Sequence, residues 1–243
     1  MFHEFIIYKL NTNNTYGGIN MNESIASVDI HTEEVSHKMI GKKIYYVVKR
    51  FFDCLIALLA LIITSPIMLI VSIAIKLDSK GPVIFKQVRT GKYGKTFKLY
   101  KFRTMAVDND VHDFSNKDQH TKVGTFLRKV SLDELPQFIN VLKGDMSFIG
   151  PRPWITDYWD YMNKEQRHRC DVLPGITGLA QAKGRNNISI FDKINYDLEY
   201  IRNYSLKEDL KVIFLTIKTV VSKSGADAGK GTIQNELEDL KNQ

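Results

Sequence analysis

Residues 51–77 read FFDCLIALLALIITSPIMLIVSIAIKL, and this stretch decides the architecture of the chain. No charged side chain occurs from Cys54 to Ile75, a length that forms about 33 Å of α-helix at 1.5 Å per residue. The hydrocarbon core of a bilayer is about 30 Å thick. Because the core helices of soluble proteins are rarely apolar on every side, the stretch predicts a membrane-inserted helix.

Two ways of inserting this helix are compatible with its sequence. Ser65-Pro66 lies near the middle, and a proline there removes a backbone hydrogen bond and bends the helix. Basic side chains flank both ends, namely Lys42, Lys43, Lys49 and Arg50 before the apolar run and Lys76 and Lys80 after it. Since basic residues favour the cytoplasmic face, this symmetry suits a helix that enters the bilayer, bends and returns. A straight single crossing that tolerates the proline is the alternative.

Composition limits the partners of the chain. Its 243 residues include 34 basic and 27 acidic side chains, which give a formal charge of +7 and indicate anionic partners such as phosphates or anionic lipids. Cys54 lies inside the apolar run, so it is badly placed for a disulfide with Cys170, and a reducing compartment fits. A nucleic-acid partner is not expected, because the chain has a membrane-length apolar run and no recognised binding motif.

Residues 83–103 predict a basic β-hairpin. VIFKQVR and TFKLYKFRTM alternate apolar and polar residues, and Gly91–Lys95 supplies the turn between them. The basic residues of the hairpin are Lys86, Arg89, Lys92, Lys95, Lys98, Lys101 and Arg103. Most are expected to face solvent or lipid headgroups, while one or two reach a phosphate.

An acidic pair follows in the stretch SLDELPQ, residues 131–137, directly after Arg128 and Lys129. Apolar residues at helical spacing predict a helix that starts near Asp133 and ends at Gly144. The first interpretation of the pair is structural: Asp133 caps the helix and Glu134 is favoured by its dipole. The second is that the two carboxylates carry out the chemistry.

The tripeptide Pro151-Arg152-Pro153 restricts the backbone on both sides of an arginine. A guanidinium held in this way has little freedom left to lose and suits bidentate phosphate binding. A structural turn with a solvated arginine is the alternative.

Further along the chain, residues 155–172 predict a helix with an aromatic face, and Leu206 to Val221 predict a basic amphipathic helix that suits a bilayer surface or a core.

Five stretches together resemble one family. These are KRFFD with the apolar run broken by Ser-Pro, FKQVRTGKYGKTFKLYKFRTM, LRKVSLDELPQ, GDMSFIGPRP and LPGITGLAQAKGRNN. They are similar to the bacterial sugar transferases, the monotopic polyprenyl-phosphate sugar-1-phosphate transferases, over roughly residues 45–225. The resemblance implies an α+β fold with a re-entrant helix-break-helix, broken at Ser65 and Pro66, and a small, mostly helical catalytic domain with a β-hairpin. We therefore expect a variable extension (1–40), a membrane helix (41–80), a catalytic domain (81–225) and a polar tail (226–243).

The resemblance also implies the chemistry. Such enzymes transfer a sugar phosphate from a nucleotide sugar, here expected to be a UDP-sugar, to undecaprenyl phosphate and release the nucleoside monophosphate. Asp133 would be the nucleophile and would form a phosphoryl-enzyme intermediate, and Mg²⁺ would be held at Asp133 and Glu134. For Glu134 the alternative role is to position a basic residue. The implied substrate-binding residues are Lys95, Arg103, Arg128, Pro151, Arg152, Pro153 and Arg185.

We expect such an enzyme at the cytoplasmic face of the cell membrane, with both ends of its membrane helix in the cytoplasm. It would take part in capsule, O-antigen or glycoprotein glycan synthesis, and homodimerisation is left open. The competing hypothesis is a membrane-anchored scaffold of polysaccharide assembly, in which Asp133 only caps a helix.

Overall fold

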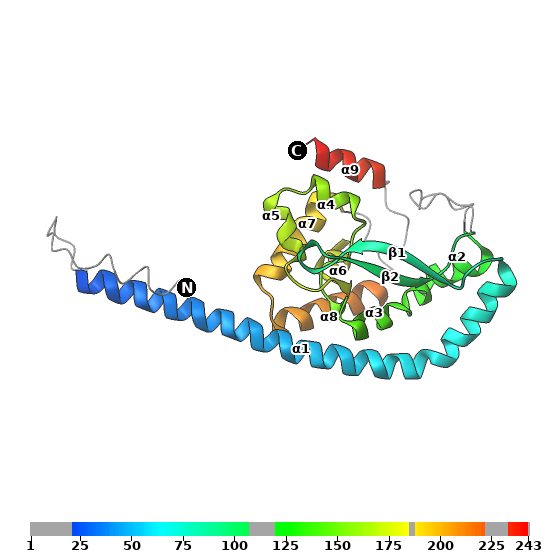
Figure 1. The fold of residues 1–243 in the computed structure, drawn as a ribbon, viewed down its shortest axis with the longest axis horizontal. Helices are drawn as coiled ribbons and strands as arrows, with labels where there is room; N and C mark the ends of the chain where they lie inside the picture. Colours follow the sequence, from blue (N-terminus) through cyan, green and yellow to red (C-terminus); the bar gives the residue numbers. More distant parts are fainter. Residues whose placement is uncertain (1–20, 107–119, 185–187, 222–232, 243) are drawn as a thin grey trace. The chain divides into compact units, whose positions relative to one another are not determined.

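A computed structural model describes residues 21–106, 120–184, 188–221 and 233–242 (Figure 1). The chain divides into two compact units, Met1–Ile44 and Tyr45–Gln243. In the first unit, residues 21–44 form the beginning of helix α1 (Met21–Asp78). Half of the expected variable extension is therefore helical backbone, and its first 20 residues lie outside the described part of the chain.

The apolar run forms the rest of α1, within the second unit. The segment Lys43–Asp78 has a mean hydropathy of 2.8 over its most apolar window and buries only 11% of that window against the protein. The helix continues through Pro66 and curves in its C-terminal half (Figure 1). The hydroxyl of Ser65 donates a hydrogen bond of 2.8 Å to the carbonyl of Ile62. Pro66 lacks the N–H that this carbonyl would accept, so Ser65 restores the lost bond without interrupting the helix.

Both halves of this segment pack on the same unit. On its first half, Ala57 is buried beside Leu99, Val141 and Met146. On its second half, Val71 and Ile75 are buried in a cluster with the hairpin and α2. The end of the helix is held by Arg103, whose guanidinium donates to the carbonyls of Ser79 and Lys80. Between these attachments, most of the large apolar side chains of α1 are exposed.

The predicted hairpin is confirmed. Strands β1 (Ile84–Thr90) and β2 (Thr96–Phe102) pair antiparallel, with Ile84 opposite Phe102 and Thr90 opposite Thr96. The turn contains the short 3-10 helix η2 (Lys92–Gly94). Gly94 has φ +75° and lies against the ring of Trp159, so this position needs both the conformational freedom and the small size of glycine.

The predicted helix at the acidic pair is divided in two. Helix α2 (Lys122–Lys129) leads to Ser131, which has φ +58°, and then to the 3-10 helix η4 (Leu132–Glu134). Helix α3 (Gln137–Lys143) starts only after Pro136 and ends at Gly144, with φ +88°. Because Pro136 has no N–H to continue an α-helical ladder, the acidic pair lies on a separate turn in front of α3.

The remaining elements build the body of the unit. They are β3 (Ser147–Ile149), α4 (Asp157–Tyr161), α5 (Lys164–Arg167), η5 (His168–Cys170), β4 (Gly175–Thr177), α6 (Leu179–Gly184), α7 (Ile190–Arg202), α8 (Leu206–Val221) and α9 (Ile233–Lys241). Strands β3 and β4 pair in parallel. The helix expected over residues 155–172 is broken at Asn163, whose side chain caps α5 in a capping box with Gln166.

The C-terminal segment is more structured than the sequence indicated. Where a polar tail was expected, α9 packs on α4 and α7, and its Leu240 is only 1% exposed. The aromatic face of residues 154–162 serves as core for this contact, since Trp154, Tyr158 and Met162 are buried in the same cluster.

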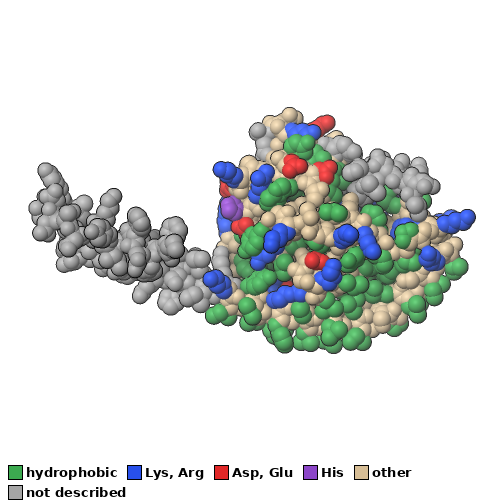
Figure 2. Space-filling model, in the orientation of Figure 1, with side chains coloured by type: hydrophobic (Ala, Val, Ile, Leu, Met, Phe, Trp, Pro, Cys, Tyr) green, Lys and Arg blue, Asp and Glu red, His purple; other side chains and the backbone are tan. Residues whose placement is uncertain are grey.

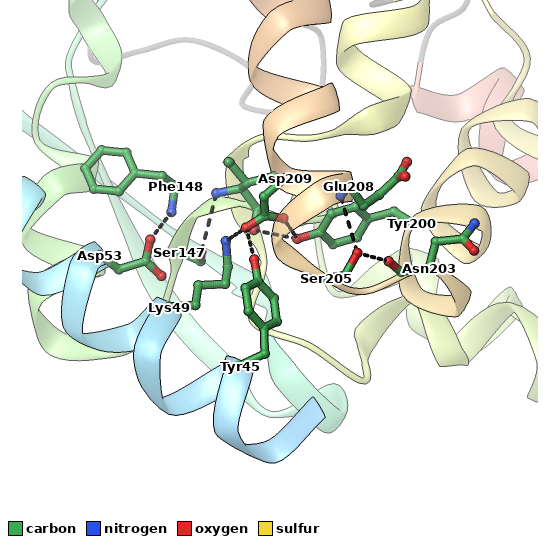
Figure 3. A network of polar contacts seen from close by, with 11 residues as sticks. Tyr45, Lys49, Asp53, Ser147, Phe148, Tyr200, Asn203, Ser205, Glu208 and Asp209 are labelled. Atoms are coloured by element: carbon green, nitrogen blue, oxygen red, sulfur yellow. Dashed lines mark hydrogen bonds and ion pairs between the residues drawn. The ribbon is translucent and has the colours of Figure 1, made fainter. Parts of the chain in front are cut away.

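A buried polar network joins the start of the apolar part of α1 to α8 (Figure 3). The ammonium of Lys49 forms an ion pair with Asp209, which also accepts a 2.5 Å hydrogen bond from Tyr45. The Tyr200 hydroxyl lies 2.6 Å from Asp209 Oδ1 and 3.2 Å from the carbonyl of Ile149 at the end of β3. In parallel, Asp53 accepts from the backbone N–H of Phe148 at 3.3 Å. Helix α1 therefore holds β3, the strand that leads into Pro151-Arg152-Pro153.

We predict that Lys49→Met lowers the free energy of unfolding by about 3–5 kcal/mol, because it leaves the buried carboxylate of Asp209 without its counter-charge. Denaturant unfolding in detergent measures the change. Arg202→Met is the matched control, because it breaks an ion pair with Glu165 whose side chains are 70% and 73% exposed, and such pairs contribute little. Wild-type stability of Lys49→Met would contradict this account of the network.

Candidate active site

At the centre of the site, the carboxylate of Glu134 pairs with two cations. Glu134 Oε1 accepts a 2.7 Å hydrogen bond from Lys101 Nζ on β2 and a 2.8 Å hydrogen bond from Arg152 Nη2. These two contacts bring the hairpin, η4 and the Pro-Arg-Pro loop to one point. The side chains of Glu134 and Lys101 are 21% and 20% exposed and that of Arg152 is 40% exposed, so the pairings are partly shielded from water.

Asp133 lies beside this cluster but is less engaged. Its Oδ2 is 3.8 Å from Lys101 Nζ, which is longer than the roughly 2.7–3.2 Å of a hydrogen bond. The left-handed conformation of Ser131 and the tight turn of η4 direct the two neighbouring carboxylates into different surroundings. Asp133 therefore has a nearby positive charge, and no other described residue occupies its oxygen atoms.

The two carboxyl groups have opposite pKa shifts. Burial raises the pKa of Asp133 above its ordinary value, against the opposing charge of Lys101. The charge of Glu134 acts with burial, whereas those of Arg128 and Arg152 act against it. Burial alone would raise the pKa of Glu134 as well, but Arg152 and Lys101 outweigh it and hold that pKa well below its usual range. Adjacent carboxyls whose pKa values are separated by their environments are typical of catalytic sites.

The backbone of the loop that carries Arg152 is held by a buried arginine, Arg169. Pro151 and Pro153 are buried, and Arg169 Nη2 donates a 2.9 Å hydrogen bond to the carbonyl of Arg152. Arg169 is itself paired with Asp197 at 2.7 Å, with both side chains almost fully buried. Its guanidinium stacks 3.6 Å from the ring centre of Trp154. The buried pair therefore orients the backbone of Arg152 and leaves its guanidinium directed at Glu134.

The structure brings most of the sequence-derived candidates together. Asp133, Glu134 and Arg152 form the centre, with Pro151 and Pro153 around Arg152, and the charge of Arg128 acts on Asp133. Arg185 lies outside the described residues.

Two candidates from the hairpin lie elsewhere. Arg103 is buried against the carbonyls that end α1. Lys95 is exposed at the turn, about 20 Å along the strand from Lys101 at some 3.3 Å per residue.

Lys101 and Arg169 were not among the candidates from sequence. Lys95, Lys101 and Arg103 have the same parity in the strand, so alternation places all three on one face and does not distinguish them. Arg169 sits in a run of charged residues that carries no local signal of burial.

A divalent cation fits this site only together with a substrate. Among the residues that the structure describes, no group of three Asp, Glu, His or Cys side chains is placed to hold a metal ion. Glu134 is already occupied by two cations, which makes it a poor metal ligand. Asp133 has free oxygen atoms, and Mg²⁺ is commonly bound by one or two carboxylates together with substrate phosphates and water. The donor set therefore fits a cation that Asp133 would hold together with a bound diphosphate.

Comparison with known proteins agrees with this geometry. The family model described as bacterial sugar transferase matches residues 44–223, which include α1 from Ile44 onward and every described element of the site. The chain belongs to the bacterial sugar transferase family. It is accordingly a transferase, and the resemblance inferred from its motifs is confirmed.

Three relatives show what the family contains. The chain is 45% identical over 181 residues to the uncharacterized sugar transferase EpsL of Bacillus subtilis, covering 74% of this chain and 90% of that protein. It is 49% identical over 191 residues to the UDP-glucose:undecaprenyl-phosphate glucose-1-phosphate transferase of Klebsiella pneumoniae, covering 73% of this chain and 41% of that protein. It is 41% identical over 198 residues to the UDP-N-acetylgalactosamine-undecaprenyl-phosphate N-acetylgalactosaminephosphotransferase of Aeromonas hydrophila, covering 77% and 47%. The chain thus spans nearly all of the first relative and less than half of the other two.

We predict that Lys101→Met lowers sugar transferase turnover by about 100-fold or more, because it removes a cation placed at the reacting charges. Steady-state kinetics in detergent measure the effect, and thermal unfolding checks that the variant is folded. Lys95→Met, which changes the same residue type at the exposed turn of the hairpin, should stay within about twofold of wild type. Equal losses in the two variants would contradict the placement of Lys101.

Proposed function

We propose that this transferase moves a sugar-1-phosphate from a UDP-sugar to undecaprenyl phosphate and releases UMP. The observation that carries the proposal is Asp133, a buried carboxylate with no close partner among the described residues, beside a cluster of cations that a diphosphate would complete. The names of the Klebsiella and Aeromonas relatives support it, since each specifies a UDP-sugar and undecaprenyl phosphate. These two names differ in the sugar, so the sugar is left open here.

The reaction follows as two displacements at one phosphorus atom. A carboxylate oxygen of Asp133 bonds to the phosphorus next to the sugar, the bond from that phosphorus to the bridging oxygen breaks, and the electron pair leaves with the oxygen on UMP. A phosphate oxygen of undecaprenyl phosphate then attacks the same phosphorus, and Asp133 departs as a carboxylate. No proton has to be gained or lost in either step.

The cations around Asp133 make the first displacement feasible. A carboxylate that approaches a diphosphate meets a repulsion of about 4 kcal/mol per charge pair at 4 Å and an effective dielectric constant of 20. Lys101 and Arg152 are both paired with Glu134, the residue next to Asp133. The charge of Arg128, at the end of α2, also acts on Asp133. Glu134 is then a positioning group, because it fixes Lys101 and Arg152 in place before the substrate arrives.

Mg²⁺ is the expected cofactor. Asp133, together with the two phosphates of the donor, would hold it, and it would neutralise the charge of the diphosphate during attack. Glu134 is excluded from this role in our proposal by its two existing ion pairs.

We infer that the apolar part of α1 dips into the cytoplasmic leaflet and returns. Both ends of the segment Tyr45–Asp78 are attached to the same unit, through Lys49 and Asp53 at one end and Ser79 at the other. A straight crossing would separate these ends by the thickness of the bilayer, and one folded unit cannot bind both.

Hydrophobic side chains gather along the lower edge of the molecule, beneath a band of lysine and arginine (Figure 2). Helix α8 exposes further apolar side chains, namely Leu206, Leu210, Ile213, Phe214 and Ile217.

The first test uses Asp133→Asn with a panel of UDP-sugars, undecaprenyl phosphate and Mg²⁺. We expect UMP release to fall by at least about 1,000-fold, because an amide cannot form the acyl phosphate while it can still cap a turn. Intact-protein mass spectrometry of the wild type, incubated with the donor alone, should show a sugar-phosphate adduct that Asp133→Asn lacks. Normal transfer by this variant would favour the membrane-anchored scaffold instead.

The second test addresses the membrane helix. With Cys54 and Cys170 replaced by serine, single cysteines at the exposed positions Lys43 and Lys80 report the side of each end. We expect an impermeant maleimide to label neither site in intact cells and both after permeabilisation. Labelling of one site in intact cells would show a straight crossing. Pro66→Ala, which removes the bend, should shift the protein towards that result.

A further inference from the structure

Among the residues that the structure describes, the guanidinium of Arg89 has no carboxylate partner, although it lies beside the active site. Arg89 is on β1, and the next residue, Thr90, donates its backbone N–H to the carbonyl of Trp154 at 2.9 Å. The end of β1 is therefore bonded directly to the chain that follows Pro153. This places Arg89 next to the loop that presents Arg152.

The contacts of Arg89 leave its charge uncompensated. Its Nη2 donates to Gln87 Oε1 at 2.5 Å, and its Nε is buried with no hydrogen-bond partner in the described residues. Glu134, the described carboxylate whose charge acts on Arg89, is already paired with Lys101 and Arg152. Burial, with the charge of Arg152 beside it, lowers the pKa of Arg89 to about 10. The charge of Glu134 acts on both Arg89 and Arg152, so one carboxylate faces two guanidinium charges. A bound anion would balance the remaining positive charge.

The order of the charges indicates which anion. Asp133 is next to Lys101 and Glu134, and Arg152 pairs with Glu134. In the hairpin, Arg89 pairs with Phe97 and Lys101 pairs with Phe85, so Arg89 and Lys101 share a face and lie four residues, or about 13 Å, apart along the strands. Because Asp133 lies beside Lys101, Arg89 lies further along the hairpin, away from the nucleophile. A diphosphate attacked by Asp133 at its sugar end would extend its nucleotide-side phosphate in this direction.

We propose that Arg89 is a substrate-binding residue that holds the nucleotide-side phosphate of the donor, the phosphate that leaves as UMP. This rests on the proposed function and adds a residue to it. When the bond from the attacked phosphorus to the bridging oxygen breaks, the electron pair remains on that oxygen, and the leaving phosphate gains one negative charge. Arg89 supplies a fixed positive charge where this negative charge develops, as expected of a group that stabilises the transition state.

The test compares the binding of UMP and uridine to the full chain in detergent, each measured by competition with the UDP-sugar donor. In Arg89→Gln the amide still donates to Gln87 but carries no charge. We expect it to weaken UMP binding by about tenfold or more, the usual effect of losing a charged hydrogen bond. Uridine has no phosphate, so its binding should stay within about twofold. The kcat for UMP release should fall as well.

Two further variants make the comparison specific. Lys86→Gln removes a charge from the same strand, but from the opposite face, where its ammonium lies over the ring of Tyr100; it should leave UMP binding unchanged. Arg89→Lys keeps the charge without the planar fork and should lie between Arg89→Gln and wild type.

Unchanged UMP binding in Arg89→Gln, or an equal loss of UMP and uridine binding, would overturn the assignment. If wild-type protein neither binds UMP nor accepts any UDP-sugar, the proposed function itself fails. These results are distinguishable, because the first two occur in an enzyme that is still active.

Discussion

The carboxylate of Glu134 is the point on which the site depends. Its partners Lys101 and Arg152 are 33 and 18 residues away in the sequence, so this one group joins three segments that have no local reason to meet. Without it, Lys101 and Arg152 would face one another as like charges in a partly buried place. Because the pairing exists before any substrate binds, the cations need little rearrangement when a phosphate arrives.

Asp133 and Glu134 show how neighbouring residues of the same chemistry acquire different roles. The 3-10 helix η4 turns tightly after the left-handed Ser131, so the side chains of these two adjacent residues enter different environments. Glu134 meets two cations at hydrogen-bond distance and is held ionised. Asp133 is buried with a cation at 3.8 Å and keeps its oxygen atoms unoccupied. The pair therefore separates into a group that organises the site and a group that is free to react.

The membrane segment is part of this organisation. Lys49 and Asp53 lie on the first turns of the apolar helix within the catalytic unit, and their partners Asp209 and Phe148 belong to α8 and β3 (Figure 3). Tyr200 extends the network to Ile149, two residues before Pro151. A buried ion pair of this kind adds little net stability compared with apolar packing, but the loss of one partner is costly. The same apolar helix that we propose to enter the membrane therefore also fixes the strand in front of the Pro151-Arg152-Pro153 loop.

Much of the protein follows from local physical chemistry. The length and uniform apolarity of residues 54–75 predict a membrane helix, and the structure has a helix there that is long and apolar enough to cross a bilayer. The two-residue alternation on either side of Gly91–Lys95 determines the hairpin, and the motifs suffice to recognise the family. The acidic pair and Pro-Arg-Pro also carry their own signal, because proline restricts the backbone wherever it occurs.

Other features were decided only by tertiary structure. Lys95, Lys101 and Arg103 are equivalent by residue type and by parity in the strand, and only the packing of the hairpin against η4 and α1 gives them different roles. Arg169 and Arg89 are functional candidates because of what lies next to them: a buried Asp197 for the first, and no available carboxylate for the second. Secondary structure and membrane insertion depend on neighbours in sequence, which the chain displays directly. Charge compensation depends on neighbours in space, and these exist only once the chain has folded.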